Sequence, residues 1–264
     1  GAWPLSVERA VAYMEKAVRE AKQHTTWTEV SEAYESALKH FVTATLGSAE
    51  FIAEVEKFLA LLVEPGRINS LSQTLLKLTT PGVPDIYQGT ELWDMSLVDP
   101  DNRRPVDYAV RQRLLAELLN LTPEQIMARS DESLPKLWLI QKTLTFRREH
   151  PEMFGAHSQY VPLKPEGSRA EHVVAFLRSA GANSILTVVP RLLMKAKSPG
   201  RGIPLAKEWW QDTQLTLPDE VCGTAWLNIL TGDKFSANPA TGSRKLSLAR
   251  VFSGFPVALL VKLT

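Results

Sequence analysis

The sequence predicts an α+β protein in which a helical region precedes an antiparallel β-sandwich. Up to about residue 150, apolar residues recur every three or four positions, which is the spacing of a helix with one buried face. Beyond it, short runs rich in β-branched residues or leucine alternate with Gly, Pro, Asn and Asp, as in all-β domains. The charge balance changes at the same place, because residues 1–150 hold 17 Lys+Arg and 21 Asp+Glu, whereas residues 151–264 hold 13 and 8. We therefore expect one domain in residues 1–150 and a second in residues 151–264.

The helical region is predicted to begin with a helix over residues 7–21, for which Ser6 is placed as the N-cap. A second apolar pattern covers residues 30–46. A third starts after Ser48, another candidate N-cap, and is expected to stop at Pro65-Gly66. Further helices are expected over residues 69–78, 106–119 and 134–149.

The second region is predicted to consist of short strands. They are expected over residues 173–177, 184–189, 225–230, 245–248 and 257–263. Turn signals lie at Gly181-Ala182-Asn183 and Thr231-Gly232-Asp233, because Gly, Asn and Asp tolerate positive φ. Several short strands at this spacing favour an antiparallel sandwich.

Composition excludes several classes of function. The 264 residues include 30 Lys+Arg and 29 Asp+Glu, so the chain has no overall attraction for nucleic acid or an acidic membrane. Cys222 is a single cysteine, which excludes an internal disulfide framework and a multi-cysteine zinc site, and His157 and His172 lack the spacing of metal ligands. No apolar run approaches the roughly 20 residues of a membrane span. The start at Gly1 lacks an initiator Met and a signal-peptide core, so we expect a chain cut from a longer, cytoplasmic protein.

The segment between the fourth and fifth expected helices is the least typical. Val83–Tyr87 is long enough for one short buried strand, Gly89 permits a sharp exit, and Glu91 places a carboxylate at the strand's end. The following loop, residues 97–105, is stiffened by two prolines and is dense in hydrogen-bonding groups, namely Asp99, Asp101, Asn102, Arg103 and Arg104.

A rigid loop that offers carboxylates and guanidinium groups can bind a neutral polyhydroxyl ligand, because every sugar hydroxyl both donates and accepts a hydrogen bond. The same residue types near turns also pair with each other or cap helices. Residue chemistry alone leaves both interpretations of this loop open.

The residues of this segment resemble a known enzyme family. Gly82-Val-Pro-Asp-Ile-Tyr-Gln-Gly-Thr-Glu91 resembles the G-x-P-x-x-Y-x-G-x-E motif around the eighth barrel strand of the α-amylase superfamily, and Asp99-Pro-Asp-Asn-Arg103 resembles its D-P-x-x-R loop. The longer string over residues 80–107, with residues 1–4 and 19–27, is similar to the maltooligosyltrehalose synthase family, the (1→4)-α-D-glucan 1-α-D-glucosylmutases.

The resemblance implies a retaining glucosyl transfer without metal or organic cofactor. In that family an aspartate nucleophile, a glutamate acid/base and a third carboxylate convert the reducing-end α-1,4 bond of a maltooligosaccharide into an α,α-1,1 bond. These three carboxylates lie on or after the fourth, fifth and seventh barrel strands, upstream of the region that this chain resembles. We therefore expect a C-terminal fragment that carries the last strand of a (β/α)8 barrel, lacks the N-terminal part of its own barrel, and is inactive by itself, with no catalytic residue of its own.

The resemblance also implies substrate-binding residues. Asp99 and Arg103 match the D-P-x-x-R loop, which contacts glucose units on the donor side of the cleaved bond, and Asn102 and Arg104 flank that pair. Two further candidates, Tyr87 and Glu91, match the strand motif and are as well suited to shaping the barrel wall.

Two alternatives remain open. The chain could come from another hydrolase or transferase of the superfamily. Residues 151–264 could instead form a non-catalytic carbohydrate-binding module, in which Trp209 and Trp210 would be the residues to stack on sugar, although paired tryptophans are more often buried.

Overall fold

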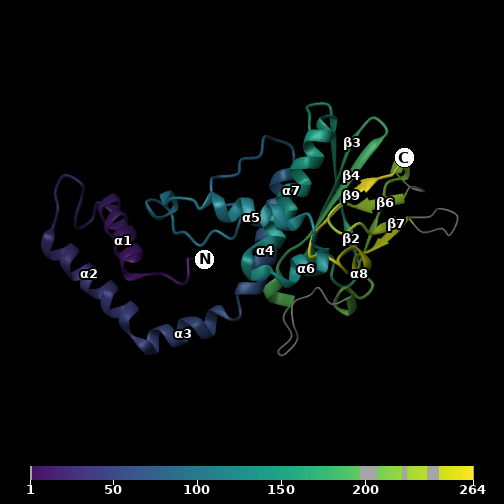
Figure 1. The fold of residues 1–264 in the computed structure, drawn as a ribbon. Helices are drawn as coiled ribbons and strands as arrows, with labels where there is room; N and C mark the ends of the chain where they lie inside the picture. The colour runs from purple at the N-terminus through teal and green to yellow at the C-terminus, as the bar shows by residue number, and fades with distance from the viewer. Residues whose placement is uncertain (1, 197–206, 222–224, 237–243, 264) are drawn as a thin grey trace. The chain divides into compact units, whose positions relative to one another are not determined.

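The computed structural model describes residues 2–196, 207–221, 225–236 and 244–263. Cys222 lies outside the described residues. The chain divides into two compact units (Figure 1), of which the first comprises residues 1–63 and 88–108 and the second residues 64–87 and 109–264. The domain boundary expected near residue 150 stays a prediction.

The first unit is helical. It contains α1 (Val7–Ala21), α2 (Glu32–Gly47), α3 (Ala49–Leu59) and the short 3-10 helix η1 (Asp101–Arg103). The two predicted N-caps are confirmed, because Ser6 Oγ accepts from the backbone N–H of Arg9 and Ser48 Oγ accepts from that of Phe51, each at 3.3 Å. Ser48 is the one residue between α2 and α3.

A buried carboxylate joins the first two helices. Glu35 of α2 accepts from Arg19 of α1 through Nε at 2.8 Å and Nη2 at 2.7 Å, and Thr25 Oγ1 donates to the same carboxylate at 2.8 Å. These hydrogen bonds, chiefly those from Arg19, lower the pKa of Glu35 to about 2.

The helices of the second unit are α4 (Val63–Thr79), α5 (Tyr108–Leu118), α6 (Pro123–Ala128), α7 (Leu134–Glu149) and α8 (Leu248–Val251). The expected helix break at Pro65-Gly66 is wrong. Pro65 lies in the first turn of α4, where a missing N–H removes no intrahelical hydrogen bond. The short helix α6 was not predicted, although Thr122 and Gln125 form a capping box at its start.

The strands of the second unit form two antiparallel sheets, and the five strands predicted beyond residue 150 are present. The six-stranded sheet has the order β1 (Gln159–Leu163), β3 (Val173–Ala180), β4 (Asn183–Pro190), β9 (Ala258–Lys262), β6 (Ala225–Asn228) and β7 (Lys234–Ser236). The three-stranded sheet has the order β2 (Pro165–Glu166), β5 (Gln214–Thr216) and β8 (Lys245–Ser247). Short 3-10 helices lie at Ser130–Glu132, Pro151–Met153, Ala170–His172, Leu193–Ala196, Lys207–Trp210 and Asp219–Val221.

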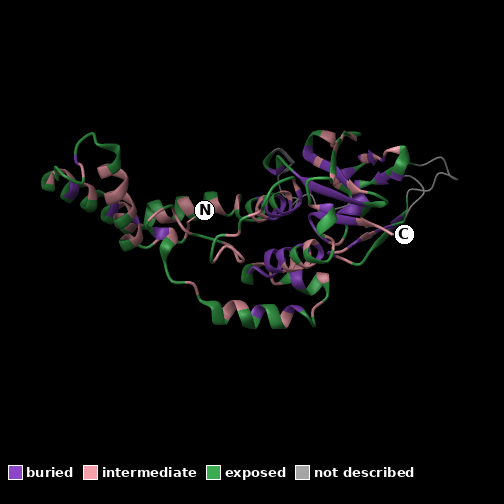
Figure 2. Ribbon diagram, turned by 90° about the horizontal axis from the view of Figure 1, so that it is seen from above, coloured by how far each residue is buried: buried purple, intermediate pink, exposed green. Residues whose placement is uncertain are grey.

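One hydrophobic cluster takes its residues from both sheets. Leu177 and Leu186 from the larger sheet and Leu215 and Leu246 from the smaller one belong to a single buried cluster, together with Trp226. Figure 2 shows buried residues concentrated in these strands and in the helices of the second unit, whereas α3 buries no residue. The α+β class is therefore confirmed.

The strand expected at Val83–Tyr87 is wrong for this chain. No described strand pairs with these residues, and Val83 is 97% exposed. A strand of a parallel barrel takes its backbone hydrogen bonds from a neighbour on each side and buries both faces, so a short apolar run alone does not form one.

Candidate functional site

The loop that follows Asp94 is fixed to α1 by a buried carboxylate within the first unit. The Asp101 side chain is 3% exposed and accepts from Arg9 Nε at 2.8 Å and Arg9 Nη2 at 2.7 Å. It also accepts from the backbone N–H of Leu97 at 2.7 Å. The hydrogen bonds from Arg9 are the main reason why the pKa of Asp101 is lowered to about 2. Asp101 therefore anchors the loop, a role that the motif comparison did not assign to it.

The structure brings two of the predicted site residues together. Nε of Arg103 lies 2.5 Å from Oδ1 of Asp99, while Oδ2 of Asp99 lies 2.9 Å from Nζ of Lys16 on α1. The Arg103 side chain is 70% exposed and the Asp99 side chain 26% exposed. The guanidinium group is thus held at its inner end and open to solvent at its outer end.

Two oxygen acceptors in this loop are enclosed but accept no hydrogen bond from the described residues. They are Oδ1 of Asp99 and Oδ1 of Asn102. Oδ1 of Asp99 faces the Arg103 guanidinium in their ion pair, so the Asn102 oxygen is the one with neither kind of partner among the described residues. Enclosed polar atoms are normally satisfied, and an exception calls for a donor such as water or a ligand hydroxyl.

Arg104 supports the loop. Its Nε donates to the carbonyl of Asp101 at 3.0 Å, and its Nη2 donates to Ser96 Oγ at 3.1 Å. Both hydrogen bonds are internal to the loop, so the structure gives Arg104 a supporting role.

The two residues of the strand motif belong to different units. Tyr87 lies in the second unit and is 45% exposed, whereas Glu91 lies in the first unit and is half-buried. The structure leaves their predicted contact with substrate untested.

The tryptophan pair is a packing feature. Trp210 is fully buried in the sheet core. The half-buried Trp209 packs edge-on against it at 4.7 Å between ring centroids, with the Arg169 guanidinium 4.9 Å from the Trp209 ring. Trp210 therefore has no face available for a sugar ring.

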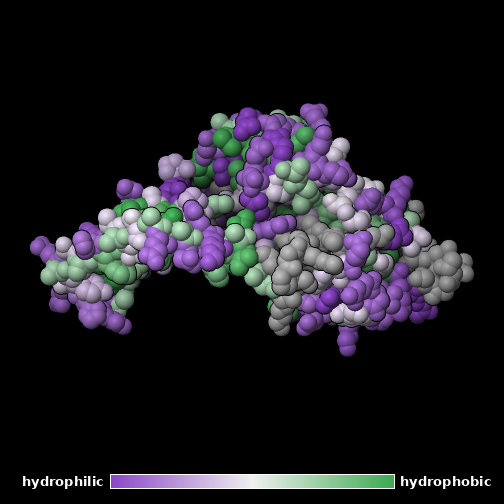
Figure 3. Space-filling model, turned by 90° about the horizontal axis from the view of Figure 1, so that it is seen from below, coloured by the Kyte–Doolittle hydropathy of each residue, from purple (hydrophilic) through white to green (hydrophobic). Residues whose placement is uncertain are grey.

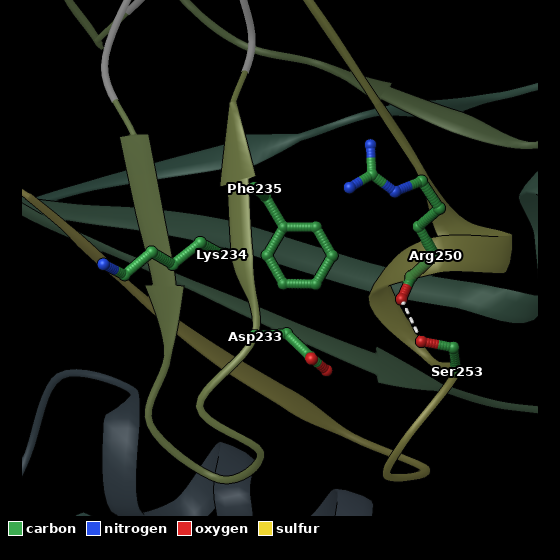
Figure 4. A pocket seen from close by; sticks show the side chains of 5 residues that line it. All are labelled: Asp233, Lys234, Phe235, Arg250 and Ser253. Atoms are coloured by element: carbon green, nitrogen blue, oxygen red, sulfur yellow. Dashed lines mark hydrogen bonds between the residues drawn. The ribbon is translucent and has the colours of Figure 1, made fainter.

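A hollow of about 220 Å³ lies between β7 and α8 in the second unit (Figure 4). Its aromatic residue, Phe235, is 5% exposed and lies beneath the guanidinium of Arg250 at 5.7 Å. The Lys234 side chain points to the side of the strand away from Arg250. The hollow thus lacks the flat, open ring on which a pyranose stacks.

Within the described part of the chain, no helix has the length and apolarity to cross a membrane. No cluster of three or more His, Cys, Asp or Glu among the same residues is arranged to hold a metal ion.

The motifs at residues 82–91 and 99–103 resemble those of the α-amylase superfamily of carbohydrate-active enzymes, and comparison with known proteins narrows this resemblance. Two curated proteins of Mycobacterium tuberculosis, from strains CDC 1551 and H37Rv, are assigned as maltooligosyl trehalose synthases and are each 37% identical to this chain over 269 residues, covering 99% of it. No family model matches the chain.

Comparison with solved structures points to the same family. The maltooligosyltrehalose synthase of Arthrobacter ramosus superposes with a TM-score of 0.79 at 34% identity, covering 99% of this chain and 31% of that enzyme. A second maltooligosyl trehalose synthase superposes with a TM-score of 0.72 at 26% identity, covering 97% of this chain and 30% of that one. The chain spans about 30% of the length of the curated relatives it matches. The resemblance to maltooligosyltrehalose synthases is therefore confirmed along the whole chain.

Proposed function

We propose that this chain is the C-terminal part of a cytoplasmic maltooligosyltrehalose synthase. The complete enzyme would convert the reducing-end α-1,4 bond of a maltooligosaccharide into the α,α-1,1 bond of a trehalose end. Residues 1–150 would supply the end of the catalytic barrel, where residues 82–91 would pair as the last strand only beside the neighbouring strands of the complete enzyme, and residues 151–264 would form the closing β-sandwich. The similarity to such enzymes over 99% of the chain supports this assignment.

The observation that carries the role of the loop is an enclosed Asn102 oxygen without a donor, next to the partly exposed Asp99–Arg103 ion pair. Oδ1 of Asn102 has no donor among the described residues, and Arg103, paired with Asp99, carries further N–H donors into solvent. Adjacent sugar hydroxyls would donate to the Asn102 oxygen and the Asp99 carboxylate and accept from the Arg103 guanidinium. In this proposal Asp99, Asn102 and Arg103 contact the donor-side glucose.

The loop would contribute binding and orientation, not bond cleavage. A donor-side glucose held by several charge-assisted hydrogen bonds keeps its anomeric carbon where the nucleophile of the complete enzyme can reach it. Asp101 and Arg104 would keep the loop in shape, while Tyr87 and Glu91 would line the barrel wall or touch the sugar. The nucleophile, the acid/base and the third carboxylate would come from the rest of the enzyme.

The test uses the full-length enzyme that contains this chain. Asp99→Ala and Arg103→Ala are each expected to lower kcat/KM for maltopentaose by about 1–3 kcal/mol of transition-state stabilisation, because each removes a hydrogen bond to a charged group. Arg113→Ala is the matched control, since it removes an exposed arginine from an ion pair outside the loop, with Glu117. Unchanged kinetics in both alanine variants would remove the loop from the substrate site.

A second test concerns the chain by itself. Purified residues 1–264 should bind maltooligosaccharides weakly and convert none of them, because the three bond-breaking carboxylates would lie elsewhere. Formation of trehalose ends by this chain alone would overturn the assignment as a part of the enzyme.

A further inference from the structure

Two arginines from distant parts of the second unit meet at the C-terminal end of α4. Nη1 of Arg147, on α7, donates to the carbonyl of Leu78 at 2.6 Å. Nη1 of Arg178, on β3, faces the carbonyls of Thr79 and Thr80 at 3.2 and 3.4 Å. The last carbonyls of a helix lack intrahelical partners and carry partial negative charge, so two guanidinium groups satisfy them well.

Of these two arginines, Arg178 on β3 is enclosed by the protein. Arg178 is 1% exposed, and none of the described carboxylates forms an ion pair with it. Its Nε donates to Ser158 Oγ at 3.1 Å. The ring of Phe154 lies beneath both cations, 5.4 Å from the Arg178 guanidinium and 4.2 Å from that of Arg147.

Such a group is costly to bury. Desolvation and the neighbouring charge of Arg147 lower the pKa of Arg178, which measures how poorly this interior suits a cation. A buried charge is tolerated only where polar partners surround it, and here the partners are carbonyls at the end of α4, Ser158 and an aromatic face. The main polar contact of this cation is therefore the end of one helix.

That helix end is where the motif segment begins. Residues 80–87 leave α4 directly, with Gly82 at φ 128° turning the backbone and Val83 97% exposed. Near its middle, α4 is joined to the end of β4, because Ser72 Oγ donates to the carbonyl of Pro190 at 3.1 Å. The sheet therefore holds α4 near its middle and at its exit.

We infer that Arg178 is a positioning residue that fixes where residues 80–87 leave α4, with Arg147 as its partner. The inference rests on the proposed function for the importance of that segment to catalysis. If this inference holds, the six-stranded sheet, which carries Arg178, helps to position residues 80–87. The sheet is then not a separable sugar-binding module.

The experiment compares Arg178→Met, Arg178→Lys and Arg147→Met in the full-length enzyme with Lys245→Met, which removes an exposed cation from β8. Hydrogen exchange of peptides covering residues 80–87 and steady-state kinetics on maltopentaose are measured at a temperature where circular dichroism shows each variant folded. Arg178→Met should speed exchange across residues 80–87 and lower kcat/KM about tenfold or more, as expected for a displaced site. Arg178→Lys should recover part of both effects, and Lys245→Met should match the wild type.

The two readouts separate the possible failures. Unchanged exchange in folded Arg178→Met overturns the inference, and so does faster exchange with unchanged kcat/KM. If Arg178→Met does not fold, Arg147→Met decides by the same two criteria, since Arg147 is only half-buried. An enzyme that does not act on maltopentaose refutes the proposed function, while the exchange measurement still reports on the anchoring of α4.

Discussion

Arg9 of α1 and Asp101 of the candidate loop form a two-point ion pair, with Nε and Nη2 of the arginine 2.8 and 2.7 Å from the two carboxylate oxygens. The pair joins positions that are 92 residues apart in the chain. It explains how a surface loop keeps Asp99 and Arg103 in a fixed arrangement. Asp99, which matches the motif, is partly exposed, whereas Asp101, two residues further on, is buried and holds the loop in place.

Asp101→Ala should destabilise the first unit by about 1–3 kcal/mol, because it leaves Arg9 and the Leu97 N–H without their shared acceptor. Asp131→Ala is the matched control, since that carboxylate is 91% exposed in its ion pair with Arg67 and such pairs contribute about 0–1 kcal/mol. Urea denaturation followed by circular dichroism measures both. Equal effects of the two substitutions would contradict the anchoring role.

Acid should unfold the first unit in a defined range. The pKa values of Asp101 and Glu35 are both lowered to about 2, from ordinary values of 3.8 and 4.5. Unfolded carboxyls take up protons at higher pH than these folded ones, so their stabilisation is complete above about pH 4.5 and is lost as the pH falls towards 2. Helicity measured against pH should decline in that interval. Glu35→Gln should flatten this decline. If the variant loses helicity over the same pH range as the wild type, Glu35 does not contribute to the acid sensitivity.

Gly167 should tolerate no side chain. Its φ is 104°, and a Cβ there would lie 2.8 Å from Cα of Thr213, so we expect Gly167→Ala to cost about 3 kcal/mol. Gly181 also has a positive φ, of 58°, but a Cβ added there would meet no atom within 4 Å, and Gly181→Ala should cost about 1 kcal/mol. The thermal unfolding temperatures of the two variants compare backbone strain combined with a steric clash, at Gly167, with backbone strain alone, at Gly181. A smaller loss for Gly167→Ala would show that the backbone at Thr213 yields.

The isolated chain should self-associate through α3. Phe51 and Phe58 lie two turns apart on this helix and are 42% and 61% exposed, and hydrophobic side chains show at the surface over the helices of the first unit (Figure 3). Large exposed apolar patches drive association. Phe51→Ser with Phe58→Ser should lower the apparent mass in light scattering. Glu54→Ser with Lys57→Ser on the same helix is the control, and an equal reduction there would disfavour an apolar cause.

Local signals accounted for the helices that the sequence predicted well. The bounds of α1 and α7 follow from an apolar stripe and a clear start or stop, and serine hydroxyls cap α1 and α3 as expected. Pro65 gave a false stop signal because proline breaks a helix only in its interior, and the first turn of α4 begins before it. The strands β1, β2, β5 and β7 carry weak patterns, because two to five residues give little periodicity.

The sequence alone could not predict features that depend on residues distant in the chain. The apolar run at Val83–Tyr87 has the pattern of a strand, but a strand exists only where another strand pairs with it. The sequence shows Asp99 and Asp101 as equivalent acids in one loop, and only the position of Arg9 distinguishes the displayed one from the buried one. The meeting of Arg147 and Arg178 at the end of α4 has no sequence signature at all.

The two units are interleaved along the chain, since it passes from one to the other after residues 63, 87 and 108. During synthesis the whole first unit is therefore available once residue 108 has emerged, whereas α4 must wait for β3 before Arg178 reaches it. The first unit can fold on the ribosome ahead of its neighbour, and no single cut separates the two. Deletions from the N-terminal end up to residue 63 remove first-unit residues alone, and deletions from the C-terminal end back to residue 109 remove second-unit residues alone, so only a truncation that reaches into residues 64–108 removes parts of both units.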